Sequence, residues 1–188
     1  MRVIAGEFRS RPLIAPSGFD TRPTSDRLRE TLFNVLAPRI ADAVFLDLYA
    51  GSGAVGIEAL SRGAREAIFV EQAEAPMKTI RANLAKLGIQ GNYALEARSA
   101  AAALKRLAEQ GRAADIVFLD PPYADEPEYT LSLGLLGGAC RAVLAPDGVV
   151  IAEHQKRLDL EECCGNLTRF RVLRQGDAAL SFYRAGRD

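Results

Sequence analysis

The chain has 188 residues, of which 48% are hydrophobic and 26% are charged. This length and composition are typical of one soluble globular domain whose core needs no disulfide or structural metal. No apolar run has the length of a membrane span, and the first residues, MRVIAGEFRSRPL, lack the apolar stretch of a signal peptide. We therefore expect a cytoplasmic protein. The cysteines and the histidine do not form a metal-ligand pattern, so we expect reduced thiols and no metal: Cys140, Cys163, Cys164 and His154.

The formal net charge is zero, but cationic side chains are concentrated near the N-terminus. Residues 1–39 contain seven arginines, no lysine and only four acidic residues. On charge alone, the simpler explanation of these arginines is a basic face that is only solvated. Arginine also binds phosphate groups bidentately and stacks on bases, so contact with nucleic acid is the alternative.

The first 39 residues predict an extension that precedes the main domain. Residues 1–14 favour a short extended hairpin or edge strand, and residues 15–24 form a loop rich in Pro, Gly and Asp. Ser25 is a candidate helix N-cap, and Pro38 ends the helix that follows. Apolar residues recur along that helix at helical spacing: Leu28, Leu32, Val35 and Leu36. We expect residues 1–39 to form an N-terminal arm with a capping helix, and residues 40–188 to form the main domain.

From residue 44 onward, predicted strands alternate with predicted helices. We expect strands at 44–50, 67–71, 93–97, 115–120 and 148–153. We expect helices at 55–62, 74–87, 99–109 and 128–144, and a final hairpin at 170–174 and 179–184. This alternation predicts an α/β fold with a mostly parallel sheet covered by helices on both faces, plus an antiparallel hairpin.

A glycine turn follows the first predicted strand. The sequence DLYAGSGAVG, residues 47–56, places glycines where strand meets helix, which permits a tight turn and close approach of a ligand to the backbone. Glu71 lies at the end of the second strand, where a carboxylate can accept both ribose hydroxyls of an adenosine moiety. Close packing of helix on strand is the structural alternative, but the strand–turn–helix context with Glu71 favours a nucleoside cofactor.

The glycine turn does not by itself distinguish NAD from S-adenosylmethionine. A dinucleotide-binding fold has a second half and often a separate substrate domain, whereas only about 70 residues follow the fourth strand here. The segment after that strand also carries different chemistry. Both features favour S-adenosylmethionine.

The tetrapeptide Asp120-Pro121-Pro122-Tyr123 follows the fourth strand. Consecutive prolines remove two N–H donors, which leaves the Asp120 carboxylate and the Pro121 carbonyl as acceptors. Two acceptors suit an exocyclic –NH2 group, whose lone pair they turn toward an electrophile, and Tyr123 can stack on the base. A rigid turn is the structural alternative. Methyl transfer of this kind needs positioning but no metal and no covalent nucleophile, and the base must leave its stack.

With these motifs, the chain resembles the RsmD-type 16S rRNA guanine-N2 methyltransferases, a branch of the class I methyltransferases. The stretches that carry the resemblance run from the N-terminus to the fourth strand. They are RVIAGEFRSRPL (2–13), TRPTSDRLRETLFN (21–34), LDLYAGSG (46–53) continuing to LSRGA (60–64), and DPPY (120–123). The glycine turn and DPPY are shared by many amino-methyltransferases, and the second stretch is the more specific one.

The resemblance implies a Rossmann-like three-layer sandwich with a seven-stranded sheet, a catalytic domain at residues 40–188 and an RNA-facing extension. It implies a guanine in 16S rRNA of the small ribosomal subunit, or of an assembly intermediate, as the target. The implied cofactor contacts are Asp47, Gly51, Ser52, Gly53 and Glu71. Arg98 and Ser99 lie where many relatives have an acidic or amide residue near the adenine of the cofactor. Either the Ser99 side chain or backbone groups alone would bind the adenine here. The implied RNA-facing residues are Arg9, Arg11, Arg22, Arg27 and Arg29.

Three other functions are consistent with parts of the sequence. An adenine-N6 methyltransferase would use the same Asp-Pro-Pro-Tyr turn, although no DNA target-recognition domain is evident. A nicotinamide-dependent oxidoreductase would need a Tyr-x-x-x-Lys pair, which the sequence lacks. A non-catalytic RNA-binding module would not need Asp120 or the glycines. We expect a monomer, and structural roles for His154, Tyr129 and the final hairpin.

Overall fold

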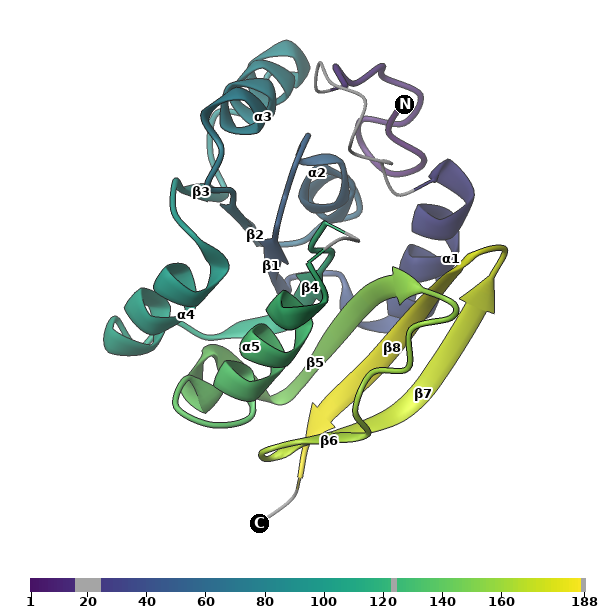
Figure 1. Cartoon of the computed structure of the whole chain (residues 1–188). Helices are drawn as coiled ribbons and strands as arrows, with labels where there is room; N and C mark the ends of the chain where they lie inside the picture. Colours follow the sequence, from purple (N-terminus) through teal and green to yellow (C-terminus); the bar gives the residue numbers. More distant parts are fainter. Residues whose placement is uncertain (16–24, 123–124, 187–188) are drawn as a thin grey trace. The chain divides into compact units, whose positions relative to one another are not determined.

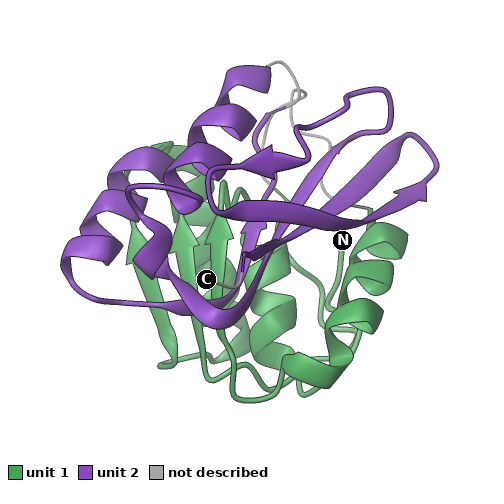
Figure 2. Cartoon of the chain, turned by 90° about the horizontal axis from the view of Figure 1, so that it is seen from below, with its two compact units in different colours: residues 1–98 green, residues 99–188 purple. Residues whose placement is uncertain are grey.

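The computed structural model describes residues 1–15, 25–122 and 125–186. Its chain divides into two compact units, residues 1–98 and 99–188 (Figure 2). Figure 1 shows the helices and strands of each unit. Among the described residues, no helix combines the length and apolar character that crossing a bilayer requires.

Unit 1 contains three parallel strands in the order β3-β2-β1. Every residue of β1 is buried, which explains its nearly continuous apolar sequence, VFLDL. The elements of this unit are α1 (Asp26–Leu36), η1 (Ala37–Arg39), β1 (Val44–Leu48), α2 (Ala54–Ser61), β2 (Glu66–Val70), α3 (Glu74–Leu87) and β3 (Tyr93–Glu96).

The helix ends of unit 1 follow local signals in the sequence. Ser25 caps α1, because its side-chain oxygen accepts a hydrogen bond from the Leu28 N–H at 3.2 Å. After α1, Pro38 lies in the short 3-10 helix η1, so the predicted end of this helix is confirmed. Gly88 ends α3 in the left-handed conformation, with a φ of 76°.

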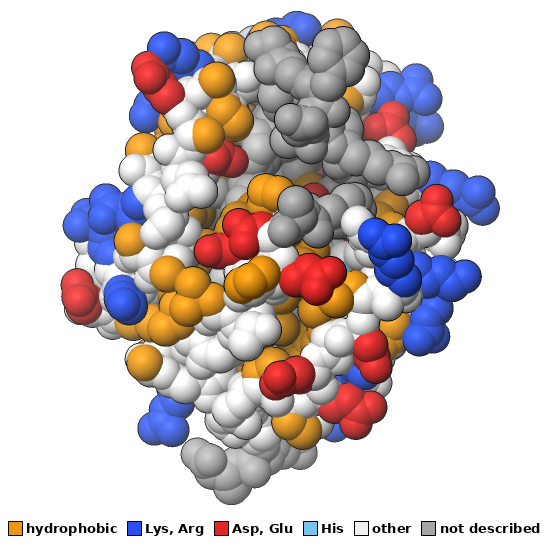
Figure 3. All heavy atoms as spheres, viewed as in Figure 1, with side chains coloured by type: hydrophobic (Ala, Val, Ile, Leu, Met, Phe, Trp, Pro, Cys, Tyr) orange, Lys and Arg blue, Asp and Glu red, His pale blue; other side chains and the backbone are white. Residues whose placement is uncertain are grey.

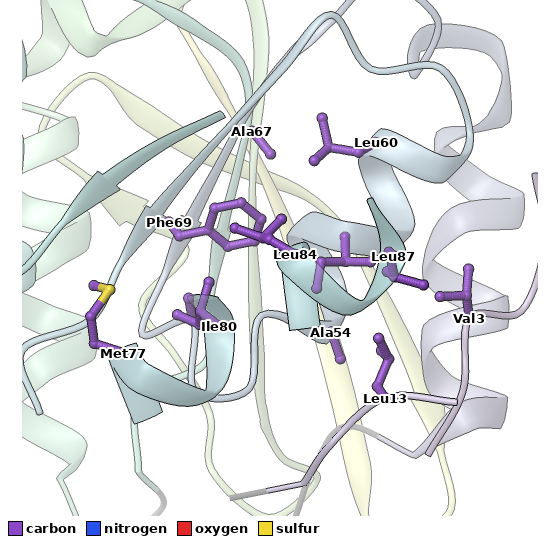
Figure 4. Close-up of a cluster of buried hydrophobic side chains, with 12 residues drawn as sticks. Val3, Leu13, Ala54, Leu60, Ala67, Phe69, Met77, Ile80, Leu84 and Leu87 are labelled. Carbon is purple, nitrogen blue, oxygen red and sulfur yellow. The ribbon is translucent and has the colours of Figure 1, made fainter. Parts of the chain in front are cut away.

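The arm, which we define as residues 1–14, is docked on unit 1. Its two halves pair through hydrogen bonds from the Val3 N–H to the Arg11 carbonyl at 3.0 Å and from the Leu13 N–H to the Met1 carbonyl at 3.2 Å. Val3 and Leu13 are buried in a cluster with Leu84 and Leu87 of α3 (Figure 4). Of the two predicted forms, the hairpin is present and the edge strand is not: one isolated bridge, Arg2 with Pro12, joins the two halves, and bends and turns lie between them. The arm contributes two buried side chains to the hydrophobic core.

Unit 2 contains strands in the order β4-β5-β8-β7-β6. The β4–β5 pair is parallel, and the pairs β5–β8, β8–β7 and β7–β6 are antiparallel. Its elements are α4 (Ala100–Glu109), β4 (Ala114–Leu119), α5 (Glu126–Leu136), η2 (Arg141–Val143), β5 (Leu144–Gln155), β6 (Cys163–Cys164), β7 (Leu167–Gln175) and β8 (Ala178–Ala185). The α/β class with a C-terminal antiparallel hairpin is confirmed. The described residues form eight strands instead of seven, since the two-residue β6 pairs with β7.

The helix predicted for residues 128–144 is shorter in the structure, where α5 ends at Leu136. Gly137 explains this end. A Cβ atom at Gly137 would lie 1.7 Å from the Cys164 carbonyl oxygen, so the chain leaves the helix where two backbone segments meet closely.

Tyr129 and His154 in unit 2 are buried, as expected for structural residues. The Tyr129 hydroxyl donates a hydrogen bond to the Glu153 carbonyl at 2.7 Å. The Nε2 atom of His154 lies 2.8 Å from the Ser181 hydroxyl oxygen. Burial lowers the pKa of this histidine. Each group has its polar atoms satisfied inside the fold.

Candidate active site

The glycine turn joins β1 to α2 through left-handed backbone. Tyr49, Gly51 and Gly53 have φ values of 64°, 54° and 77°. A side chain at Gly53 would be strained by this conformation and would also approach Ile80, at 3.2 Å. At Gly51 the nearest described atom to such a Cβ would be 4.0 Å away. This spacing is compatible with close approach of a ligand to the backbone, which stays a prediction.

Gly56 has a different function in the same turn. A Cβ atom there would lie 2.4 Å from Cε1 of Phe69 on β2. The third glycine of the motif therefore permits close packing of α2 on β2, while the first two shape the loop.

Asp47 is buried and connects the end of β1 to the first turn of α2. Its Oδ2 accepts a hydrogen bond from the Gly56 N–H at 2.9 Å. Burial raises the pKa of Asp47 to about 7; the Gly56 hydrogen bond opposes this rise and the Glu71 charge adds to it. Asp47 thus holds the glycine turn, and a contact with a cofactor remains a prediction.

We expect the stability of the protein to depend on pH through Asp47. Because the folded chain holds a proton on Asp47 that the unfolded chain releases above about pH 4, the unfolding free energy falls as pH rises toward about 7. The loss should reach a few kcal/mol. Urea unfolding across this pH range should show a flatter profile for Asp47→Asn. Parallel profiles for the two proteins would contradict the expected titration.

Glu71 anchors the same loop from the end of β2. Its Oε2 accepts a hydrogen bond from the Gly51 N–H at 3.0 Å, and its Oε1 accepts one from the Ala73 N–H at 2.8 Å. The residue is partly exposed. Each carboxylate oxygen has a second lone pair, so the side chain can also accept hydrogen bonds from two ligand hydroxyls.

The other three predicted cofactor residues have partners within the protein. Arg98 forms an ion pair with Glu96, at 2.7 Å between Nε and Oε2. The Ser99 hydroxyl caps α4 by accepting a hydrogen bond from the Ala102 N–H at 3.3 Å. The Ser52 hydroxyl faces Met1, with its oxygen 3.8 Å from the sulfur. Their contacts with a cofactor remain predictions.

The Asp-Pro-Pro-Tyr turn follows β4 in unit 2. Asp120 is partly buried, Pro121 is buried and Pro122 is exposed. The Pro122 carbonyl accepts a hydrogen bond from the Asp125 N–H at 2.8 Å, just before α5 begins at Glu126. Tyr123 lies outside the described residues. The two prolines fix the backbone beside the Asp120 carboxylate, as predicted.

The five arginines predicted to face RNA have different environments. Arg9, Arg11 and Arg27 are exposed, and Arg22 lies outside the described residues. Arg29 is fully buried, and its Nη2 donates to the Arg2 carbonyl at 2.5 Å and to Asp26 Oδ1 at 3.0 Å. The prediction that Arg29 faces RNA is wrong, because its guanidinium holds the arm to α1 inside unit 1.

A family model described as Conserved hypothetical protein 95 matches residues 1–184. The chain belongs to this family. This family is the RsmD family, so the resemblance noted from the motifs is confirmed.

YlbH of Bacillus subtilis, named provisionally as an rRNA methyltransferase, is 36% identical over 98% of both chains. Ribosomal RNA small subunit methyltransferase D of Escherichia coli is 45% identical over 65% of this chain and 60% of its own length. The solved structure of yhhF from Escherichia coli, also named provisionally as a methyltransferase, aligns over 100% of this chain and 99% of its own, at 34% identity and a TM-score of 0.85.

In this RsmD-family chain, Asn83 and Glu58 are buried polar residues that the sequence motifs did not identify. Asn83 and Glu58 are fully buried and bind backbone groups of the arm. A signal for Asn83 was present, because it lies three residues after Ile80 and four before Leu87 on the apolar face of α3. A polar residue at such a position requires buried hydrogen-bond partners.

Proposed function

We propose that this chain transfers a methyl group from S-adenosylmethionine to the exocyclic N2 amine of a guanine in 16S rRNA. The observation that carries the proposal is the glycine turn held by Glu71 in a chain of the RsmD family. The names of the Bacillus subtilis and Escherichia coli relatives support rRNA as the substrate. The Asp-Pro-Pro-Tyr turn supports an amino group as the acceptor.

The residues of the turn fit S-adenosylmethionine. The spacing at Gly51 is compatible with close approach of a ligand to the backbone, and the partly exposed Glu71 carboxylate suits the two ribose hydroxyls. The bound cofactor would supply a methyl group activated by a positively charged sulfur. Within the described ranges, no three carboxylate, thiol or imidazole side chains come together as a metal site.

The Asp-Pro-Pro-Tyr turn would prepare the guanine amine. The Asp120 carboxylate and the Pro121 carbonyl accept its two hydrogens, which directs the nitrogen lone pair away from the ring plane. As the new N–C bond forms, positive charge develops on the nitrogen, and the nearby carboxylate stabilises that charge. The proton that the nitrogen then releases can pass to Asp120. Tyr123 stacks on the base in this proposal.

The proposed substrate is 16S rRNA within the small ribosomal subunit or an assembly intermediate, and the protein acts as a cytoplasmic monomer. Residues 1–39 form the RNA-facing extension, with Arg9, Arg11, Arg22 and Arg27 on phosphate groups. Exposed cationic side chains are interspersed with acidic ones on the face shown in Figure 3, in keeping with the zero net charge. Local arginines, and not a global field, would therefore guide the RNA.

The test is methyl transfer to small ribosomal subunits from cells that lack such an enzyme. Labelled S-adenosylmethionine supplies the methyl group, and the digested RNA is analysed for modified nucleosides. Label in N2-methylguanosine is the expected result. Label in N6-methyladenosine would replace guanine by adenine as the target, and absence of transfer to RNA would overturn the substrate assignment.

Replacing Arg9 or Arg11 by alanine should weaken RNA binding at every sequence tested, since phosphate contacts carry no base specificity. Each change should also reduce the slope of log Kd against log salt by about one. Filter binding of a 16S rRNA fragment at several salt concentrations measures both effects. Arg81→Ala is the matched control, because it removes the same exposed charge from α3. An equal effect of Arg81→Ala would show a general loss of charge in place of a specific contact.

A further inference from the structure

Asn83 connects the arm directly to the glycine turn. Its Oδ1 accepts a hydrogen bond from the Ile14 N–H at 2.7 Å, and its Nδ2 donates to the Ile14 carbonyl at 3.0 Å. The same Nδ2 donates to the Ser52 carbonyl at 3.0 Å. Asn83 is fully buried, and both of its N–H groups are used. One side chain therefore fixes the last residue of the arm and the peptide group beside Gly53.

The chemistry of this connection requires an amide. The site offers one N–H and two carbonyl oxygens, so the central group must accept once and donate twice. An aspartate at position 83 would place a carboxylate against two carbonyls, and a leucine would leave all three backbone groups unpaired. Both changes have a cost, since buried unpaired polar groups are unfavourable.

Among the described residues, Glu58 and Ser61 also hold the arm by hydrogen bonds but do not contact the glycine turn, and Ser52 touches the arm only through a 3.8 Å contact with the Met1 sulfur. Glu58 accepts hydrogen bonds from the Ile4 and Ala5 N–H groups at 2.8 and 3.0 Å. The Ser61 hydroxyl donates to the Ala5 carbonyl at 2.6 Å and accepts from the Phe8 N–H at 3.0 Å. Ser61 is thus an attachment point of the arm that lacks the link to Ser52, which makes it a suitable control.

We propose that Asn83 is a positioning residue that couples RNA binding at the arm to cofactor binding at the glycine turn. The proposal rests on the function proposed above. RNA that binds Arg9 and Arg11 restrains the arm, and Asn83 transmits this restraint to the Ser52 peptide and the loop that binds the cofactor. Coupling between two sites is reciprocal, so a bound cofactor also restrains the arm.

The test measures the Kd for S-adenosylhomocysteine, which cannot react, with and without saturating small ribosomal subunits. In the wild type we expect RNA to lower this Kd about fivefold or more. Asn83→Leu should reduce this factor to about one, and Asn83→Asp should reduce it in the same direction. Ser61→Ala should keep the factor, although it also weakens the attachment of the arm.

Hydrogen exchange provides a second readout that needs no RNA. S-adenosylhomocysteine should slow exchange of the Ile14 amide in the wild type and in Ser61→Ala, but not in Asn83→Leu. A merely structural Asn83 would leave the coupling factor unchanged in its variants or would make Ser61→Ala equally deficient. Either result, or a wild type without coupling, overturns this inference alone. Absence of S-adenosylhomocysteine binding to the wild type would overturn the proposed function as well.

Discussion

Replacing Asp120 with alanine should lower kcat for methyl transfer by about 10²- to 10³-fold while the Kd for S-adenosylmethionine stays within about twofold. In the proposed mechanism the carboxylate acts on the amine of the target base, whereas the glycine turn and Glu71 hold the cofactor. Single-turnover methylation of small ribosomal subunits gives the rate, and equilibrium dialysis gives the Kd. Asp120→Asn should retain more activity than Asp120→Ala, because its amide oxygen still accepts one hydrogen bond.

Asp125→Ala is the matched control for this experiment. Asp125 is an exposed acidic residue before α5, and its side chain forms no capping hydrogen bond. Its replacement should change kcat by less than about twofold, because the substitution removes an exposed side chain and keeps the backbone N–H that binds the Pro122 carbonyl. An equal loss in both variants would point to the charge of the loop, and a fully active Asp120→Ala would disprove the role assigned to this carboxylate.

Replacing Glu58 with alanine should lower the free energy of unfolding by about 3 to 5 kcal/mol. Glu58 accepts hydrogen bonds from two arm amides and from Arg62 Nε at 2.7 Å, and its Oε2 lies 3.9 Å from Nε of the buried Arg29. Its loss would leave Asp26 as the acidic partner of Arg29 within the described residues and would remove two hydrogen bonds to the arm. Urea unfolding at neutral pH measures the change.

A surface ion pair provides the comparison for Glu58. Glu74 and Lys78 on α3 lie 2.7 Å apart, but their side chains are 82% and 72% exposed. Glu74→Ala should therefore cost less than about 1 kcal/mol. Glu58→Gln should fall between the two alanine variants, since the amide oxygen can keep a hydrogen bond to one arm amide. Similar costs for Glu58→Ala and Glu74→Ala would show that the buried network contributes little.

The strands and the turns of the site could be predicted because their signals are local. Apolar runs mark β1 and β4, and the residues that follow each run specify the glycine turn and the Asp-Pro-Pro-Tyr turn. The end of α5 could not be predicted, because it depends on the approach of Cys164, which is 27 residues away from Gly137 in sequence.

The error at Arg29 has a similar cause. The resemblance placed Arg29 among the RNA-facing residues, but Arg29 lies four residues before the buried Phe33 on the inner face of α1. Helical spacing could have placed Arg29 on the inner face, as it could have placed Asn83. Glu58, the partner of Arg29, and Ile14, the partner of Asn83, are distant in sequence, so only the folded chain identifies them.

The hydrogen bonds from Glu58, Ser61 and Asn83 to the arm all go to its main chain. These side chains bind amide and carbonyl groups of Ile4, Ala5, Phe8 and Ile14, and a Cβ at Gly6 would lie 1.7 Å from the Ser61 carbonyl. The buried Val3 and Leu13 and the partly buried Met1 and Phe8 add apolar packing. Because Arg9 and Arg11 are exposed, their replacement should leave the arm attached, and a loss of RNA binding in such variants would report on the arginine itself and not on a displaced arm.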